Sequence, residues 1–241
     1  MPAGYTGKSV KLLDAPNFLT GQGNFIEDMN FPNQLCMAIL LSPYPHAKIS
    51  GVRLNVPEDR FPFVTGKEVA DRTLPLQSPV TANISHYCLA VDKVRYVGEG
   101  VAAVACDSRY EARDVLDSFE VDYEPAKTIV DAEEAMSPEV PRLHEPHGSN
   151  IGWHRTLEYG NVTEAFRKAD IVLEEKIRWA RSALTPIETY GCIAQFDKVS
   201  GHLTVWGNFQ TYGVAVGISD ALRIPREKLK LVTPKKGRAY R

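Results

Sequence analysis

Three histidines and a glutamate lie close together in the second half of the chain and, by residue type, could bind a metal. They are His144, Glu145, His147 and His154, and imidazole and carboxylate groups suit several transition metals. Their spacing differs from the helical His-Glu-x-x-His motif, in which both imidazoles share one face. Pro146 also excludes a regular helix at this point. We therefore do not expect a metal site here.

Other reactive side chains lack the local context that their chemistry requires. Neither Ser182 nor Ser219 lies in a Gly-x-Ser-x-Gly turn, so a serine hydrolase is not favoured. Gly98 and Gly100 form a single glycine pair without the longer fingerprint of a phosphate-binding loop. The cysteines lack the paired spacing of zinc or iron–sulfur sites, which predicts reduced core thiols. They are Cys36, Cys88, Cys106 and Cys192.

The composition is that of an ordinary globular protein, with 44% hydrophobic and 24% charged residues over 241 positions. The formal net charge is -2, and no long block of like charge is present, which argues against nucleic acid or an anionic membrane as partner. No apolar stretch approaches the length that crosses a bilayer, and the N-terminus lacks the apolar core of a signal peptide. We expect a cytoplasmic protein with a small-molecule or protein partner.

Apolar patterning in the first half predicts mainly strands. Runs at 35–41 and 49–56 are expected to form strands that pair with each other. Three more stretches follow with a hairpin-like rhythm. They are 87–91, 94–97 and 101–106.

A helix and a last strand complete the expected first domain. Ser108 and Glu111 have capping-box spacing before an apolar face of helical period, which predicts a helix packed on the sheet. A strand at 120–123 follows and closes an α/β domain near Pro125. The polar, proline-bearing stretch at 137–150 is typical of a connector.

The second half is expected to begin afresh. Asn161 and Glu164 predict a capped short helix, followed by strands. These strands are expected at 171–177, 187–196 and 203–206. A helix at 211–222 is predicted on its apolar face, although Gly213 and Gly217 weaken it.

Several phrases resemble, in order and spacing, the large subunits of molybdenum hydroxylases of the xanthine dehydrogenase and aldehyde oxidase family. The most specific is 92–104, DKVRYVGEGVAAV, which is similar to the family's "dkVryvGepVAaVvA". TGQGNFIED, SPYPHAKI and VDYEP resemble other phrases of the family's hammerhead domain, and GNVTEAF and TPIE resemble phrases of the domain that follows it.

The resemblance implies an α/β (α+β) fold in which a hammerhead mixed-sheet domain precedes an incomplete α+β molybdenum-cofactor-binding domain. The expected divisions are an N-terminal extension at 1–17, the hammerhead domain at 18–126, a connector at 127–150, and the first segment of the molybdopterin-binding domain at 151–241. This last segment is expected to stop before the family's glycine-rich loop.

The resemblance also assigns roles to particular residues. VWGNFQ resembles a family segment whose glutamine approaches the metal centre and hydrogen-bonds an oxo ligand, and Gln210 is the matching residue. An amide can donate and accept without adding a charge. A solvent-facing glutamine at a strand end is the alternative. Glu188 matches a family glutamate that is not the catalytic base and is expected to be structural, as are Gly98 and Gly100.

In the family, a molybdenum–molybdopterin cofactor hydroxylates an aldehyde or N-heterocycle with oxygen from water and passes electrons to iron–sulfur and flavin centres. The resemblance therefore implies an iron–sulfur subunit and an FAD subunit as partners, and the cytosine dinucleotide form of the cofactor, as in bacterial relatives with separate subunits.

After residue 234 the sequence departs from the family pattern. The glycine-rich loop is replaced by KKGRAYR, and the general base of the family is expected outside this chain. A truncated or frameshifted gene and a natural split with a complementing C-terminal polypeptide both fit. One hypothesis is therefore a part of a molybdenum oxidoreductase that is inactive alone. The other is a non-catalytic fragment or interaction module, with a homo-oligomer as one form it could take.

Overall fold

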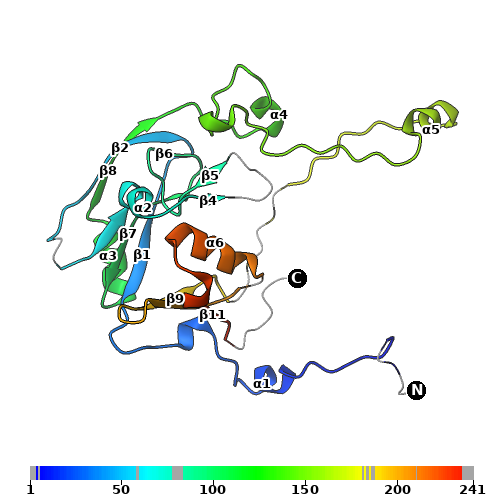
Figure 1. The fold of residues 1–241 in the computed structure, drawn as a ribbon. Coiled ribbons are helices and arrows are strands. Elements are labelled where there is room, and N and C mark those ends of the chain that lie inside the picture. The colour runs from blue at the N-terminus through cyan, green and yellow to red at the C-terminus, as the bar shows by residue number, and fades with distance from the viewer. Residues whose placement is uncertain are drawn as a thin grey trace.

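The computed structural model describes residues 4, 6–57, 60–77, 84–180, 182, 185, 188–209 and 211–234. Figure 1 shows a body formed by the N-terminal half, a long arm that carries α5 away from it, and a C-terminal sheet with α6 beside the body. The chain mixes short helices with small sheets, which confirms the predicted α/β (α+β) class. Within these ranges, no helix is long and apolar enough to cross a membrane.

The first sheet of the body has the antiparallel order β1-β7-β3. Its strands are β1 (Cys36–Leu41), β3 (Phe63–Thr65) and β7 (Gly100–Cys106). Helix α3 (Arg109–Leu116) packs on β1 and β7. Ser108 Oγ accepts a hydrogen bond from the Glu111 amide at 3.1 Å, so the predicted capped helix is confirmed. The core beneath it is built from Leu54, Phe61, Val104, Cys106, Ala112 and Val115.

The second sheet has the antiparallel order β6-β2-β8. Its strands are β2 (Ala47–Leu54), β6 (Lys93–Val94) and β8 (Phe119–Pro125). The expected pairing of 49–56 with 35–41 is wrong. Pro43 and Pro45 lie between the two strands and have no N–H to donate to a ladder, so the chain leaves the first sheet before β2 begins.

The hairpin-like rhythm predicted across residues 87–106 is only partly confirmed. The stretch 101–106 lies in β7, whereas 87–91 is not a strand and 94–97 contributes only the end of β6. A two-stranded ribbon pairs β4 (Leu76–Gln77) with β5 (Ser85–His86).

Short helices precede and follow these strands. Before β1 lie α1 (Ala15–Leu19) and the 3-10 turn η1 (Ile26–Asp28). Helix α2 (Gly66–Arg72) follows β3, and a hydrogen bond of 2.8 Å from the Thr65 amide to Glu68 Oε2 caps it. The connector, residues 127–150, contains α4 (Ala132–Ala135) and η2 (Glu145–His147).

The arm, residues 151–180, extends away from the body (Figure 1). Its one helix is α5 (Val162–Lys168), capped as predicted by Asn161 Oδ1, which accepts from the Glu164 amide at 3.0 Å. The strand predicted at 171–177 is wrong, because this segment is exposed and has no ladder partner in the described structure. A run of apolar residues such as 171–173 favours a strand only where a neighbouring strand completes the hydrogen bonds.

The C-terminal sheet has the order β11-β10-β9. Its strands are β9 (Cys192–Asp197), β10 (His202–Gly207) and β11 (Leu229–Val232). Helix α6 (Gly213–Leu222) and the turn η3 (Arg226–Lys228) connect β10 to β11. The predictions at 203–206 and 211–222 are confirmed, the strand predicted at 187–196 begins later than expected, and β11 was not predicted. The Leu74 amide donates to the Ala221 carbonyl at 2.8 Å, which joins α6 to the body.

Candidate functional site

The C-terminal sheet brings three separate chain segments to one of its ends. Cys192 pairs with Gly207 across the antiparallel strands β9 and β10, and Trp206 pairs with Val232 across the parallel strands β10 and β11. The residues just before β9, just after β10 and just after β11 therefore emerge at the same end. We call this the open end of the sheet, formed by 188–191, 208–209 and 233–234.

Two oxygen atoms at the open end are buried without a hydrogen-bond partner in the described structure. They are Oε1 of Glu188 and Oδ1 of Asn208. Leaving a buried acceptor unsatisfied costs about 1–3 kcal/mol, so such atoms require an explanation. Both atoms are acceptors, and a group that brings N–H or O–H donors to this end would satisfy them.

The site residues that the sequence predicted for this region are only partly described by the structure. Glu188 is half-buried, and its Oε1 has no hydrogen-bond partner among the described residues. Gln210 lies outside the described residues, although its neighbour Phe209 packs its ring on Gly207, where an added Cβ would lie 2.7 Å from Phe209 Cζ. Asn208 was missed. Its position two residues before Gln210 was the only signal in the sequence.

Gly98 and Gly100 lie in the turn that enters β7, far along the chain from the open end. Gly98 has a φ of +89°, and its amide donates to the Ser42 carbonyl at 2.8 Å. A Cβ added at Gly100 would lie 3.0 Å from Leu89 and 3.1 Å from Ile39. The structural role that the resemblance implies for Gly98 and Gly100 stays a prediction. That the pair binds no ligand stays a prediction.

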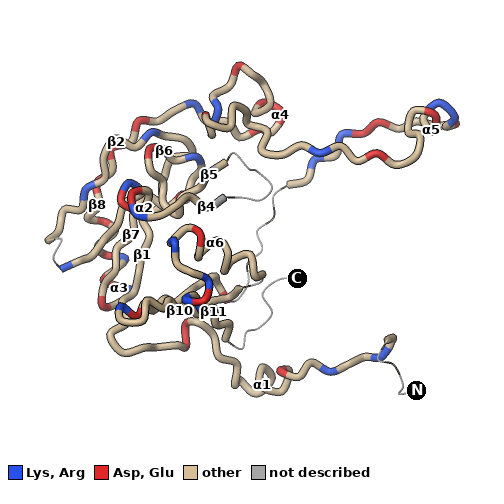
Figure 2. The backbone as a smooth tube through the Cα atoms, viewed as in Figure 1, with Lys and Arg blue, Asp and Glu red and all other residues tan. Residues whose placement is uncertain are grey.

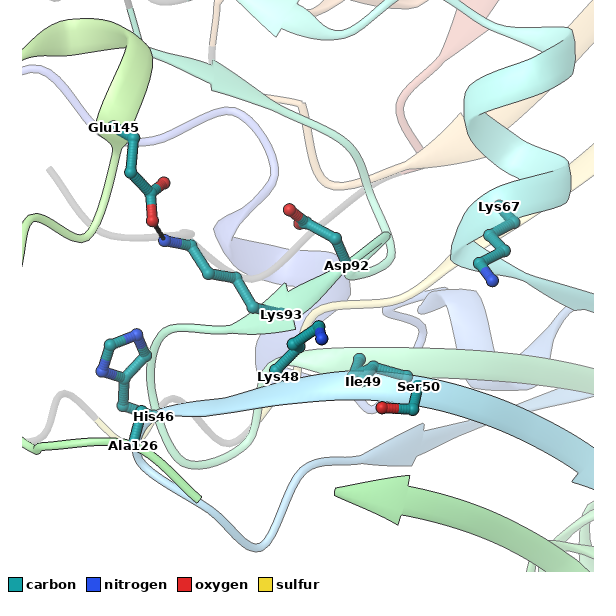
Figure 3. A pocket seen from close by; sticks show the side chains of 9 residues that line it. All are labelled: His46, Lys48, Ile49, Ser50, Lys67, Asp92, Lys93, Ala126 and Glu145. Carbon is teal, nitrogen blue, oxygen red and sulfur yellow. Dashed lines mark hydrogen bonds and ion pairs between the residues drawn. The ribbon is translucent and has the colours of Figure 1, made fainter. Parts of the chain in front are cut away.

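A second candidate is an open pocket of about 670 Å³ between the body and the connector (Figure 3). Lys93 is only 8% exposed, and its Nζ lies 2.5 Å from Oε1 of Glu145. The His46 ring nitrogen Nδ1 lies 2.8 Å from the Lys127 carbonyl, to which it donates as Nδ1–H. These two interactions, Lys93 with Glu145 and His46 with the Lys127 carbonyl, fasten the connector to the body. We interpret the pocket as structural.

His144 lies beside the same ion pair and is held neutral. Burial, together with the nearby positive charge of Arg95, lowers the pKa of His144 from 6.5 to about 4. Its ring packs edge-on against His86 with centroids 5.2 Å apart. No group of three or more metal-ligating side chains occurs in the described part of the chain. The carboxylate of Glu145 instead forms an ion pair with Lys93.

The distribution of charged residues does not indicate a further candidate site. Figure 2 shows acidic and basic residues interspersed along the body, the connector and the arm. Many are in exposed ion pairs. One such pair joins Arg53 and Asp122, 2.7 Å apart, and the hydrogen bond from Arg53 also lowers the pKa of the Asp122 carboxyl. The open end of the C-terminal sheet is therefore the strongest candidate site, because three segments converge there on two of the three buried, unsatisfied side-chain atoms among the described residues; the third is His147 Nδ1 in the connector.

Two family models match the chain. Residues 20–127 match the aldehyde oxidase and xanthine dehydrogenase a/b hammerhead domain. Residues 143–240 match the molybdopterin cofactor-binding domain. The second match contains the open end and the whole arm.

Individual proteins are similar to this chain in sequence and in structure. The carbon monoxide dehydrogenase large chain of Afipia carboxidovorans is 29% identical over 95% of this chain and 30% of its own length. A probable xanthine dehydrogenase subunit of Bacillus subtilis is 30% identical over 94% of this chain and 30% of its own. The structure of quinoline 2-oxidoreductase from Pseudomonas putida superposes with a TM-score of 0.83 at 25% identity, over 96% of this chain and 30% of that one.

The chain spans about 30% of the length of these relatives. Several relatives are named as large chains or large subunits, and one is a subunit of a dehydrogenase complex. The two consecutive domain matches, the similar sequences and the shared fold lead to one assignment. The chain belongs to the xanthine dehydrogenase and aldehyde oxidase family, and it corresponds to the hammerhead domain and part of the molybdopterin-binding domain of the molybdenum-cofactor subunit.

Proposed function

We propose that this chain forms one wall of the cofactor site in a molybdenum hydroxylase, at the open end of the C-terminal sheet. The observation that carries the proposal is the pair of buried acceptors, Glu188 Oε1 and Asn208 Oδ1, at the end where three segments converge. A pterin ring system has N–H groups that can donate to such acceptors. The residues present therefore fit the molybdopterin that the family match implies.

In this proposal Gln210, Asn208 and Glu188 orient the cofactor and carry no step of the reaction. When bound, the molybdenum cofactor supplies the chemistry that hydroxylates an aldehyde or N-heterocycle with oxygen from water. The protein contributes position and electrostatics. The cytosine dinucleotide form of the cofactor belongs to this proposal, as does a general base supplied by residues outside this chain.

The chain alone is proposed to be inactive and to need a polypeptide that supplies the rest of the relatives' length. The arm is the surface on which we expect that polypeptide to bind, because its large apolar side chains are exposed. An iron–sulfur subunit and an FAD subunit would complete a cytoplasmic complex. The exposed apolar residues of the arm are Ile151, Trp153, Leu157, Tyr159, Val162, Phe166, Ile171, Val172, Leu173, Ile177 and Trp179.

The second candidate function is a non-catalytic interaction module, and the same arm favours it. Contiguous exposed apolar surface of this kind marks a protein–protein contact. A second copy of the chain could cover the arm in a homo-oligomer. The two candidates differ in one property, which is whether molybdenum is retained.

The test is elemental analysis for molybdenum on the chain co-purified with a polypeptide that matches the remaining length of its relatives. Stoichiometric molybdenum in the complex supports the cofactor site. Asn208→Ala and Gln210→Ala should then lower the molybdenum content, whereas Gln195→Ala, on exposed β9 of the same sheet, should not. A complex that forms without metal would replace the cofactor proposal with the interaction module.

A further inference from the structure

Two of the four cysteines face each other across the first sheet. Cys36 begins β1 and Cys106 ends β7, and the two are register partners in the antiparallel ladder. Residues directly opposite on antiparallel strands project from the same face of the sheet. Both thiols therefore lie on the face that α3 covers. Cys88 and Cys192 lie outside this ladder.

The hydrogen-bond pattern fixes the separation of the two backbones. The Ala105 amide donates to the Pro62 carbonyl at 2.9 Å, on the β3 side of β7, so Cys106 by alternation turns its amide and carbonyl toward β1. Such a hydrogen-bonded pair has a Cα separation of about 5.5 Å. A disulfide spans Cα separations of about 4.4–6.8 Å. The backbone distance is therefore that of a disulfide.

The geometry also indicates some strain. Opposite residues in a hydrogen-bonded pair have Cβ atoms up to about 5.5 Å apart, whereas a disulfide needs about 3.5–4.5 Å. The strands must twist toward each other by about an ångström for the bond to form. Both cysteines stand at the ends of their strands, where the ladder can twist without disturbing pairs on both sides. Strained disulfides are reduced more easily than relaxed ones.

Access to the pair is unequal. Cys106 is 3% exposed, whereas Cys36 is half-buried. Cys106 also lines a cavity of about 170 Å³ together with residues that include Leu35 and Arg60. Burial raises the pKa of the Cys106 thiol, which disfavours its thiolate. Cys36 is therefore the thiol that meets a reagent first.

We propose that Cys36 and Cys106 are a redox-modified dithiol that a small disulfide of the glutathione class oxidises to a cross-strand disulfide. The Cys36 thiolate attacks one sulfur of the small disulfide and releases one small thiol. Cys106 then loses its proton and attacks the Cys36 sulfur of the mixed disulfide, which releases the second small thiol. Two protein thiols and one small disulfide thus become one protein disulfide and two small thiols.

The bond would fix the point at which the N-terminal segment joins the sheet. That segment contacts the C-terminal sheet through Phe31, whose ring centroid lies 4.7 Å from that of Trp206. Oxidation would thus hold β1 to β7 beside this contact. The inference does not depend on the proposed cofactor site.

The experiment uses the whole chain, purified with all thiols reduced and then equilibrated in mixtures of reduced and oxidised glutathione. Remaining thiols are blocked with N-ethylmaleimide, and peptides are mapped by mass without reduction. The expected result is one intramolecular link between Cys36 and Cys106, with maleimide on Cys88 and Cys192. Dithiothreitol should restore four alkylated thiols. The same mixtures with the urea-unfolded chain should give several alternative pairings.

Variants separate the pair from general thiol reactivity. Cys88→Ser and Cys192→Ser should leave the link unchanged, whereas Cys36→Ser should abolish it. If the native chain keeps four alkylated thiols in every mixture, stops at a glutathione adduct, or links other cysteines, the proposal is overturned. The peptide map of the native chain needs no variant, so a variant that fails to fold does not weaken the test.

Discussion

Among the described glycines, Gly66 is the one at which an added side chain would meet its neighbours most closely. It begins α2 beside the chain at Ala90 and Val91, and a Cβ added there would lie 1.8 Å from the Ala90 carbonyl oxygen. That neighbour is backbone and cannot turn away, so the helix or the 90–91 segment must shift. We expect Gly66→Ala to lower the free energy of unfolding by about 1–3 kcal/mol, measured by urea titration.

Gly217 is a matched control for Gly66, because it also lies in a helix. A Cβ there would meet only Leu76 Cδ2, at 3.7 Å, an ordinary contact. Gly217→Ala should raise the stability of α6 by up to about 1 kcal/mol through helix propensity. Equal effects of the two substitutions would contradict the steric argument.

His144 makes the stability of the connector depend on pH. Its pKa is lowered to about 4 in the folded chain from 6.5, so between these values the unfolded chain binds the proton and the folded chain does not. The contribution of neutral His144 to the free energy of unfolding is therefore fully present above the pKa of His144 in the unfolded chain, and it is lost as the pH falls below that value. From about pH 7 to about pH 5 we expect a loss of up to about 1 kcal/mol, reduced by solvent screening at this half-buried site.

Urea titrations of the parent chain and of His144→Gln at these two pH values check this prediction. The variant cannot gain a proton at this position, so its stability should change less between them. The carboxyl group of Glu145, whose pKa the Lys93 hydrogen bond lowers from 4.5, titrates below this window and does not confuse the comparison. An identical pH dependence in both proteins would contradict the assignment to His144.

At the scale of elements, Asn150 holds the connector in its folded path. Its Oδ1 accepts from the Leu143 amide at 2.9 Å, and its Nδ2 donates to the carbonyls of Ala135 and Pro141 at 3.2 and 3.0 Å. Asn150→Ala removes all three bonds and leaves partly buried backbone groups unsatisfied. We expect about 1–3 kcal/mol of local destabilisation.

Hydrogen exchange resolved by peptide measures this effect. Exchange in 131–150 should accelerate in Asn150→Ala while β2, β7 and β8 stay protected. Asn161→Ala is the matched control, since it removes the cap of α5 on the arm and should accelerate only 161–168. If both substitutions disturb the same residues, the connector is not an independent unit.

These elements also show which structures sequence can predict. Helices α3 and α5 were predicted because their caps, Ser108 and Asn161, are local signals that need no distant partner. The partner of β2 was wrong because strand pairing depends on segments far away in sequence. The segment 171–177 has the pattern of a strand, but its hydrogen-bonding neighbour is not among the described residues.

The candidate site, too, could be predicted only in part from the sequence. The resemblance pointed to Gln210, which lies outside the described residues, and to Glu188, but no periodicity could place Glu188 at one end of a sheet. That placement follows from the register of Cys192 with Gly207 and from the parallel strand β11, which was not predicted. Asn208 and the Lys93–Glu145 pair became visible only through burial.

At the scale of the whole molecule, the chain combines a packed body with an arm that is not packed. The arm meets the connector through exposed ion pairs, Lys176 with Glu133 at 2.7 Å and Arg178 with Asp131 at 3.6 Å. Exposed pairs of this kind contribute little to stability. We therefore expect residues 151–180 to be less stable than the body. The C-terminal sheet, by contrast, contacts the body through α6 and Trp206.

The arm should therefore be cleaved first. Trypsin has sites there at Arg155, Arg167, Lys168, Lys176 and Arg178. Brief digestion should release fragments that end within 151–180 while the body and the C-terminal sheet remain, because local opening is least costly where few apolar groups are buried. Fragment masses over time measure the order of cleavage. Uniform resistance of a monomeric chain would contradict the prediction.

A bound partner should reverse this susceptibility and also change the fluorescence of the arm. Trp153 and Trp179 are 60% and 88% exposed, so their emission should lie at the long wavelengths of hydrated indole and shift to shorter wavelengths when a complementing polypeptide buries them. Trp206→Phe removes the signal of the third tryptophan, which already packs on Phe31. Protection from trypsin together with this shift would place the partner on the arm. A stable complex in which the arm stays cleavable and its tryptophans stay hydrated would mean that the partner binds elsewhere, and the arm would then lose its assigned role.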